Sequence, residues 1–331
     1  VDEGLARPIL VGRPTVLKQR VERFGLRLEP GKDFDVINPE HDDRYRDYWQ
    51  EYYRLTERKG VSQAYAKIEM RRRLTLIGAM MIHMGDADGM LCGTFGTHEL
   101  HRHYIDQVIG LKAGAKTYAA MNAVMMTRRT VFIADTYVNA DPTAEQIAEI
   151  TLLAADEIRR FGIVPKAALL SHSNFGTSDH PSAVKMRRAT EILHRDHPDL
   201  IADGEMQADT AVVESILRGT YPWSRLDQPA NILVFPELQS ANIAYKLIWR
   251  LADAEAIGPV LLGMGRPVHV LQRGVEVSDI VNMATLCVLD AQVLEHAAHV
   301  VGGLGGKADL VNAHRHPGPL HRHRDLVGVL G

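Results

Sequence analysis

The sequence has 331 residues, of which 46% are hydrophobic and 24% charged, and a formal net charge of −3. That length allows two domains or one large α/β domain with a sizeable core. The charge lacks the basic excess of nucleic-acid binders, and no apolar run approaches the roughly 20 residues of a membrane span. We therefore expect neither a nucleic-acid nor a membrane partner.

The two cysteines, Cys92 and Cys287, lie in apolar surroundings. This placement favours buried thiols in a reduced, cytoplasmic protein. No signal peptide is visible, and the chain opens on Val1 without a methionine. We expect it to be a piece of a longer protein.

Apolar segments and helical patterns alternate through the first half of the chain. Strands are predicted at residues 9–12, 35–37 and 89–93, and helices at 14–25, 42–57, 61–73 and 80–84. Pro14 suits a helix start and Gly25 a helix end. The run Arg71–Arg73 is most simply a solvated helix end. Alternation of this kind favours the parallel α/β class.

The clearest helix start follows Asp141. Thr143 and Gln146 have the form of a capping box, and apolar residues then recur at helical spacing until Gly162. We place a domain boundary just before this helix, because residues 139–142 are polar and suit a crossover. Further strands are predicted at residues 167–171, 231–235 and 260–262. The composition of residues 295–331, rich in glycine, histidine and arginine, predicts a loose appendage.

The stretch from Gly258 to Asn282 joins an apolar strand, a loop with glycine and proline, and a helix start. Ser278 is predicted to be the N-cap residue, which places Asp279 in the first helical turn and Arg273 on the approach loop. Charged side chains at a strand–loop–helix junction lie where open α/β sheets bind ligands. The alternative is an ordinary capped helix with a surface arginine.

A second candidate is the polar loop S-H-S-N-F-G-T-S at residues 171–178, which precedes a helix begun near Pro181. Hydroxyls, a glycine and a helix N-terminus can hold phosphate, because free N–H groups and the helix dipole favour an anion. The candidate ligands are Ser171, Ser173, Asn174, Thr177 and Ser178. An equally simple alternative is a loop that caps its helix, with Lys185, Arg187 and Arg188 on a solvated helix face.

Other patterns do not support a site. Residues 302–307 resemble a nucleotide loop, but Val301 and Ala308 stand where a P-loop needs glycine and a hydroxyl. His98, His101 and His103 have near-ligand spacing without accompanying carboxylates, so no metal site is predicted. The absence of a glycine-rich dinucleotide motif argues against a decarboxylating dehydrogenase, the weakest of the functions considered.

Three blocks, at residues 203–209, 231–246 and 258–282, together resemble the phosphate acetyl/butyryl transferases. The resemblance spans about residues 1–292. It implies two α/β domains with a cleft between them, an architecture shared with isocitrate and isopropylmalate dehydrogenases. The first domain would comprise residues 1–138 plus 262–294, and the inserted second domain residues 139–261.

The same resemblance implies catalytic roles for Asp279, Arg273 and Arg250. Asp279 would take the proton of the CoA thiol as it attacks acetyl phosphate, while the two arginines hold phosphate and stabilise developing charge. Arg250, Gln272 and Arg273 would join the residues of the polar loop in binding CoA and phosphate.

Departures from the family pattern count against activity. Gln272 replaces a serine that assists the carbonyl, and His269-Val270 replaces an Asn-Asp pair. Phe175 replaces the lysine expected in the phosphate loop. Three changes at one site indicate that ligand binding is retained while catalysis is weakened.

The 171–178 block, the 203–209 block and G-R-P-V-H-V-L at 265–271 more closely resemble the C-terminal half of hybrid NADP-dependent malic enzymes. This resemblance implies a regulatory part that binds acetyl-CoA as an inhibitor and promotes homo-oligomerisation. NADP and a divalent metal are expected only in a malic-enzyme portion absent from this chain. The alternative function is an active phosphate acetyltransferase.

Overall fold

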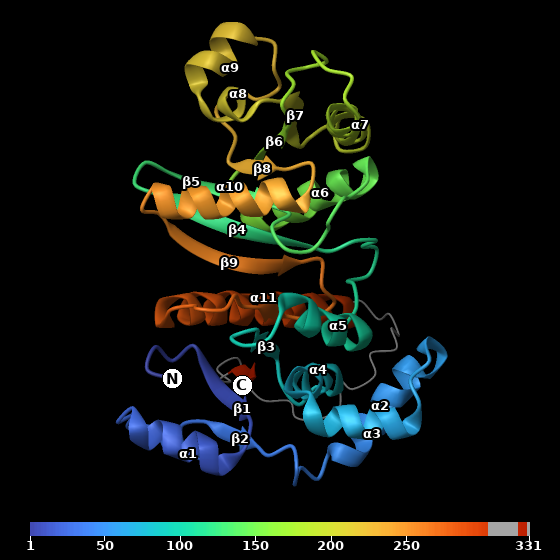
Figure 1. The fold of residues 1–331 in the computed structure, drawn as a ribbon, viewed down its shortest axis with the longest axis vertical. Helices are drawn as coiled ribbons and strands as arrows, with labels where there is room; N and C mark the ends of the chain where they lie inside the picture. The colour runs from blue at the N-terminus through green and yellow to red at the C-terminus, as the bar shows by residue number, and fades with distance from the viewer. Residues whose placement is uncertain (304–323, 330–331) are drawn as a thin grey trace. The chain divides into compact units, whose positions relative to one another are not determined.

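The structure is a computed structural model that describes residues 1–303 and 324–329 (Figure 1). The chain forms two compact units. The N/C unit comprises Val1–Lys112 and Met264–Gly331, and the insert unit comprises Ala113–Gly263. Each unit has its own sheet with helices packed on it, so the predicted class of two α/β domains is confirmed.

The N/C unit is built on a five-stranded sheet in the order β10-β3-β11-β1-β2, and each neighbouring pair is parallel. The strands are β1 (Ala6–Val11), β2 (Asp35–Ile37), β3 (Gly89–Cys92), β10 (Val268–Val270) and β11 (Arg324–Val329). The helices are α1 (Pro14–Arg23), α2 (Tyr45–Thr56), α3 (Gln63–Arg72), α4 (Leu74–Met84), α5 (His98–Val108) and α11 (Val277–Gly303), with a 3₁₀ turn η1 (Glu57–Lys59). The strands and helices predicted before residue 93 exist close to their predicted bounds, except that α4 begins at Leu74 and the predicted helix at residue 80.

The core of the N/C unit centres on α4, where every residue from Thr75 to Ile82 is buried. Such a helix is apolar all round, so it belongs in an interior and packs against β3 and β11. Cys92 and Cys287 are both buried free thiols, as predicted. Burial raises the pKa of each thiol, which keeps both protonated and unreactive.

Strand β11 corrects the prediction that residues 295–331 form a loose appendage. It lies in the middle of the sheet and pairs in parallel with both β1 and β3. Leu326, Val327 and Val329 are buried there, because a strand between two parallel neighbours is covered on both faces. Helix α11 also continues to Gly303. The His- and Arg-rich segment and most of the 302–307 loop lie outside the described residues.

Helix α11 departs from the prediction that no apolar run approaches the length of a membrane span. By length and composition, its stretch Val277–His296 is long and apolar enough to cross a membrane. This is a weak indication, because a helix that packs on a protein core meets the same criterion. Met283, Cys287 and Ala291 recur at helical spacing and are buried in the N/C unit, which accounts for part of that apolar composition.

The insert unit contains a six-stranded sheet in the order β7-β6-β8-β5-β4-β9. The strands are β4 (Ala119–Met126), β5 (Arg129–Ala134), β6 (Lys166–Leu170), β7 (Ile201–Met206), β8 (Ile232–Val234) and β9 (Glu255–Leu262). The helices are α6 (Ala144–Arg160), α7 (Pro181–Asp196), α8 (Ala208–Val212), α9 (Glu214–Thr220) and α10 (Leu238–Leu251). Strand β4 is antiparallel to β5 and β9, and the remaining pairs are parallel. The sheet is therefore mixed, whereas the sequence predicted a parallel one.

The start of the insert unit differs from the predicted boundary at residue 139. The units divide after Lys112, because β4 and β5 form a hairpin that joins the second sheet through β8 and β9. The return to the N/C unit at Met264 lies close to the predicted residue 262.

The predicted start of α6 is confirmed in detail. The hydroxyl of Thr143 accepts a hydrogen bond from the Gln146 N–H, and the Gln146 side chain accepts one from the Thr143 N–H. This capping box satisfies two N–H groups that a helix end would otherwise leave unpaired.

Candidate functional site

The predicted site residues are divided between the two units. Gln272, Arg273 and Asp279 belong to the N/C unit, and Arg250 and the 171–178 loop belong to the insert unit. Each group is described within its own unit.

Strand β10 leads directly into the loop that carries Gln272 and Arg273. The Leu271 N–H donates to the Cys92 carbonyl at 2.7 Å, which extends the pairing with β3 by one residue. His269 is buried, and its Nε2 lies 3.1 Å from Asp290 Oδ2 on α11. The histidine therefore ties β10 to α11 inside the unit and is a structural residue.

Gly93 fixes how closely this loop approaches β3. Its φ is +100°, and a Cβ built on it would lie 2.3 Å from the Leu271 carbonyl oxygen. A left-handed backbone conformation and this contact both require glycine. The position of Gln272 thus depends on a residue far away in the sequence.

The start of α11 corrects the predicted N-cap. The helix begins at Val277, so Ser278 lies inside its first turn. The carboxylate of Asp279 accepts a hydrogen bond from the Glu276 N–H at 2.9 Å. The predicted catalytic carboxylate is half-buried and stabilises the helix start, whereas Arg273 is exposed on the preceding loop.

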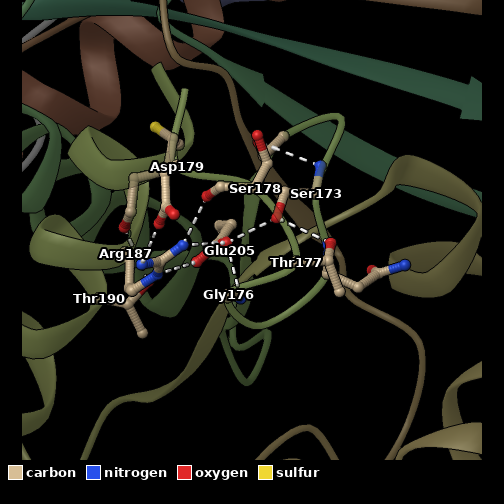
Figure 2. Close-up of polar contacts among 12 residues, drawn as sticks. Ser173, Gly176, Thr177, Ser178, Asp179, Arg187, Thr190 and Glu205 are labelled. Carbon is tan, nitrogen blue, oxygen red and sulfur yellow. Dashed lines mark hydrogen bonds and ion pairs between the residues drawn. The ribbon is translucent and has the colours of Figure 1, made fainter. Parts of the chain in front are cut away.

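The polar loop at residues 171–178 is organised around Glu205, a residue that sequence reasoning missed (Figure 2). The Glu205 side chain is fully buried, and its carboxylate accepts hydrogen bonds from Ser173 Oγ at 2.8 Å and from the Gly176 N–H at 2.9 Å. The Phe175 N–H also donates to the Glu205 carbonyl at 2.7 Å. The groups predicted to receive an external phosphate therefore bind an anionic side chain of the same chain.

Several other polar groups of the loop bond to one another, while the Asn174 side chain bonds to Gln207. The Asn174 N–H donates to Thr177 Oγ1, the Thr177 N–H donates to the Asn174 carbonyl, and the Ser173 N–H donates to Ser171 Oγ. Ser178 Oγ lies 3.1 Å from His172 Nε2. In this conformation the loop supports the helix-capping interpretation more than the phosphate cradle.

Arg187 completes the network and corrects its assignment to a solvated helix face. Its guanidinium contacts both carboxylate oxygens of Glu205 at 3.1 Å and donates to the Ser178 carbonyl at 2.8 Å. Burial alone would raise the pKa of Glu205, but hydrogen bonds from Arg187, Gly176 and Ser173 outweigh it and lower the pKa below its usual value. Glu205 therefore stays ionised at neutral pH.

The other two cations of α7 pair with exposed carboxylates. Lys185 contacts Asp141 at 2.5 Å, and Arg188 contacts Glu145 at 2.6 Å. Arg188 and Glu145 are both exposed, and such a pair contributes little to stability. The solvated-face interpretation therefore holds for Arg188, whereas the Lys185 side chain is largely buried.

Phe175 lies in an aromatic cluster. Its backbone is left-handed, with φ of 49°, and its ring lies 5.0 Å from the Tyr221 ring and 4.6 Å from the Trp223 ring. The side chain that stands where the family has a lysine therefore packs against the turn that follows α9, and presents no charge.

Helix α10 presents two cations on one side. The Arg250 guanidinium lies 3.6 Å from the centre of the Trp249 ring, which in turn stacks on Tyr245. Lys246 lies one turn before Arg250, with its ammonium 5.5 Å from the centre of the Tyr245 ring. Desolvation, and then the charge of Arg250, lower the pKa of Lys246. Sequence reasoning overlooked Lys246, although its spacing of four residues from Arg250 places both on one helix face.

Of the α5 histidines, His101 is held on both ring nitrogens by the protein itself. His101 Nδ1 lies 2.7 Å from Thr75 Oγ1, and its Nε2 lies 2.5 Å from the Phe95 carbonyl oxygen. Within residues 1–303 and 324–329, no group of three or more histidine, cysteine, aspartate or glutamate side chains could hold a metal ion.

Comparison with known families decides the classification. A model of the phosphate acetyl/butaryl transferase family matches residues 1–288. The chain belongs to the phosphate acetyl/butaryl transferase family. This assignment confirms the resemblance found in the three sequence blocks. The match covers the whole insert unit and the N/C unit as far as residue 288.

The chain is 47% identical over 291 residues to an NADP-dependent malic enzyme of Escherichia coli, covering 87% of this chain and 38% of that protein. It is 33% identical to a phosphate acetyltransferase of Synechocystis, covering 88% of this chain and 42% of that protein. The chain thus spans less than half of the length of these relatives.

The fold also matches solved members of the transferase family. A phosphotransacetylase from Streptococcus pyogenes is 34% identical, with a TM-score of 0.79, and the match covers 89% of this chain and 88% of that one. EutD phosphotransacetylase from Staphylococcus aureus is 26% identical with a TM-score of 0.74, covering 86% of each chain.

Proposed function

We propose that the chain is the transferase-like, regulatory part of a malic enzyme, which binds acetyl-CoA and promotes oligomerisation without transferase turnover. The observation that carries this proposal is the malic-enzyme likeness, at 47% identity over 38% of the relative's length. The remaining length would hold the portion that uses NADP and a divalent metal to decarboxylate malate oxidatively. A cytoplasmic location belongs to the same proposal.

The proposed acetyl-CoA contacts are the cations already described. Arg250 and Lys246 on α10 and Arg273 after β10 are exposed, and no ion pair of these three cations occurs in the described part of the chain. Acetyl-CoA carries a pyrophosphate and a ribose phosphate, which guanidinium groups bind well because N–H donors match phosphate oxygens.

Three features support binding without turnover. Phe175 supplies no charge to the phosphate loop, and its ring is held by Trp223. The loop N–H of Gly176 is bound to Glu205. The carboxylate of Asp279 accepts a hydrogen bond from the Glu276 N–H and is thereby engaged at the start of α11. A bound effector would act on the malic-enzyme portion only by binding one of two conformations more tightly.

We expect acetyl-CoA to bind the wild-type chain in calorimetry and Arg273→Ala to weaken this binding by about ten- to a hundredfold. This range corresponds to the loss of one or two charge-assisted hydrogen bonds to phosphate. The control is Arg58→Ala, which removes an exposed arginine from the same unit and should leave the affinity unchanged within about twofold.

A transferase assay with acetyl phosphate and CoA on the same samples tests the absence of turnover. Robust acetyl-CoA formation that disappears in Asp279→Asn would show an active phosphate acetyltransferase and refute the regulatory proposal. If acetyl-CoA neither binds nor forms, both functions are excluded for this chain.

For self-association we propose the exposed apolar stripe of α10. Ile243, Leu247 and Leu251 recur every four residues and are 58%, 52% and 80% exposed, which is the pattern of a helix face covered by a partner. Leu247→Asp is expected to weaken self-association by at least about tenfold in sedimentation velocity. Val164→Asp, at a 61% exposed site elsewhere in the insert unit, should have no effect; equal dissociation in both variants would exclude α10 as the interface.

A further inference from the structure

A cavity of about 860 Å³ opens in the N/C unit at the carboxyl ends of β1 and β2. Its wall includes Gly12 and Arg13, which follow β1, and Pro39 and Glu40, which follow β2. These two strands are adjacent and parallel. In open α/β sheets, ligands bind in crevices at the carboxyl ends of the strands. None of the residues proposed above to bind acetyl-CoA lines this cavity.

The wall of the cavity is strongly cationic. Four arginines line it, and a single carboxylate, that of Glu40, faces them. The arginines are Arg13, Arg20, Arg71 and Arg72. Glu40 lies 3.7 Å from Arg13, with both side chains mostly exposed, and such a pair neutralises little charge. The cavity therefore favours an anionic occupant.

Two of the arginines come from the end of α3, the run that the sequence alone assigned to a solvated helix end. The Arg71 guanidinium stacks 4.5 Å from the centre of the Tyr45 ring. Stacking occupies the face of a guanidinium and leaves its N–H edge to bind a planar or tetrahedral anion with two hydrogen bonds. Arg72, at the last position of α3, lines the same wall.

The cavity also has an apolar wall, and the N-terminus of helix α1 lies beside it. Val16, Leu17 and Leu74 line it. Helix α1 starts beside it at Pro14, and its N-cap residue provides no side-chain cap, so the positive end of the helix dipole adds to the arginine charge. The volume lies in the range of roughly 300–1,000 Å³ typical of small-molecule sites.

We propose that this cavity is an anion-binding site for a nucleotide, whose phosphoanhydride contacts Arg13, Arg71 and Arg72 while its base lies against the apolar wall. The two parts of the cavity match the two parts of such a ligand. Inorganic pyrophosphate carries the same anionic group without a base, so it fills only the cationic part. The site goes beyond the acetyl-CoA site and depends on different residues.

The test is calorimetric titration of the 331-residue chain with ADP and, separately, with inorganic pyrophosphate. We expect ADP to bind at least about fivefold more tightly than pyrophosphate, because only ADP contacts the apolar wall. Arg71→Gln/Arg72→Gln should weaken ADP binding by at least about tenfold. The charge-matched control Arg58→Gln/Lys59→Gln changes two exposed cations of the neighbouring turn η1 and should change it less than about twofold.

Two further variants keep the result decisive. Val16→Glu adds a carboxylate to the cavity at a position that is 41% exposed, and it should abolish ADP binding even if the arginine variant fails to fold. Arg273→Ala should bind ADP normally, which separates this site from the proposed acetyl-CoA site.

Several outcomes would overturn the proposal. Absence of ADP binding refutes the site. If Arg58→Gln/Lys59→Gln weakens ADP binding as much as Arg71→Gln/Arg72→Gln does, ADP is held by non-specific charge attraction. Loss of ADP binding in Arg273→Ala assigns the nucleotide to the acetyl-CoA site. Pyrophosphate binding as tight as that of ADP refutes a nucleotide-sized ligand.

Discussion

Replacement of Glu205 by alanine is expected to destabilise the insert unit by about 3 to 5 kcal/mol. The substitution removes the buried carboxylate that pairs with Arg187 and accepts hydrogen bonds from the Ser173 hydroxyl and the Gly176 N–H. The Ser173 hydroxyl keeps Thr177 Oγ1 as a partner, so the main cost is the broken ion pair of Glu205, which is about 3–5 kcal/mol for a buried pair. Urea unfolding followed by circular dichroism measures the change.

Asp179→Asn is the matched control for this substitution. Asp179 lies 3.9 Å from the same arginine, Arg187, and its side chain is 99% exposed. An exposed pair at this distance should contribute less than about 0.5 kcal/mol. If Glu205→Ala destabilises no more than this control, the carboxylate does not organise the loop.

The Glu205 network also predicts a pH dependence. The pKa of Glu205 is lower in the folded chain than its usual value, so its stabilisation is complete above about pH 4.3, the ordinary pKa of glutamate. It is lost as the pH falls through the lower, folded-state pKa. Between about pH 5 and pH 3, wild type should lose more stability than Glu205→Gln, which has no carboxylate to protonate at this position.

Gly93→Ala is expected to destabilise the N/C unit by at least about 3 kcal/mol. The added methyl group would overlap the Leu271 carbonyl oxygen, and the backbone at φ of +100° is unfavourable for any L-residue. Relief of the overlap must move the segment that carries Gln272 and Arg273, so acetyl-CoA affinity should fall together with the thermal midpoint. Calorimetric unfolding and binding titration measure both effects.

Gly274→Ala separates backbone strain from steric overlap on the same loop. Gly274 has φ of +78°, but nothing lies within 4 Å of an added Cβ. Its substitution should cost only about 1 kcal/mol. Equal destabilisation by the two variants would show that the contact between Gly93 and Leu271 is not the cause.

Features that depend on nearby residues could be predicted from the sequence. The capping box of α6 requires only Thr143 and Gln146, and both hydrogen bonds form as predicted. The start of α1 at Pro14 and the buried strand β3 also follow from local signals. The two-domain architecture was predicted from the three sequence blocks that resemble the transferase family, because a whole motif carries more information than a single periodicity.

Features that depend on distant partners were missed. The loop at residues 171–178 has the composition of a phosphate site, but Glu205 supplies its anion from the end of another strand. No local pattern shows that pairing. Strand β11 is short and follows a polar segment, and only its neighbours β1 and β3 make it a strand. The turn between β4 and β5 carries no turn signal that was recognised in the sequence. The hairpin was therefore missed, and the boundary was predicted at residue 139 instead of after Lys112.

The position of β11 has a consequence for synthesis of the protein. This strand separates β1 from β3 in the sheet, although it follows every other element of the sequence. On a ribosome, the insert unit has all its strands once Leu262 has emerged, and domains generally fold as units during translation. The N/C unit must keep β1 and β3 unjoined until residues 324–329 arrive, so its apolar strands stay exposed to chaperones for longer than those of the insert unit.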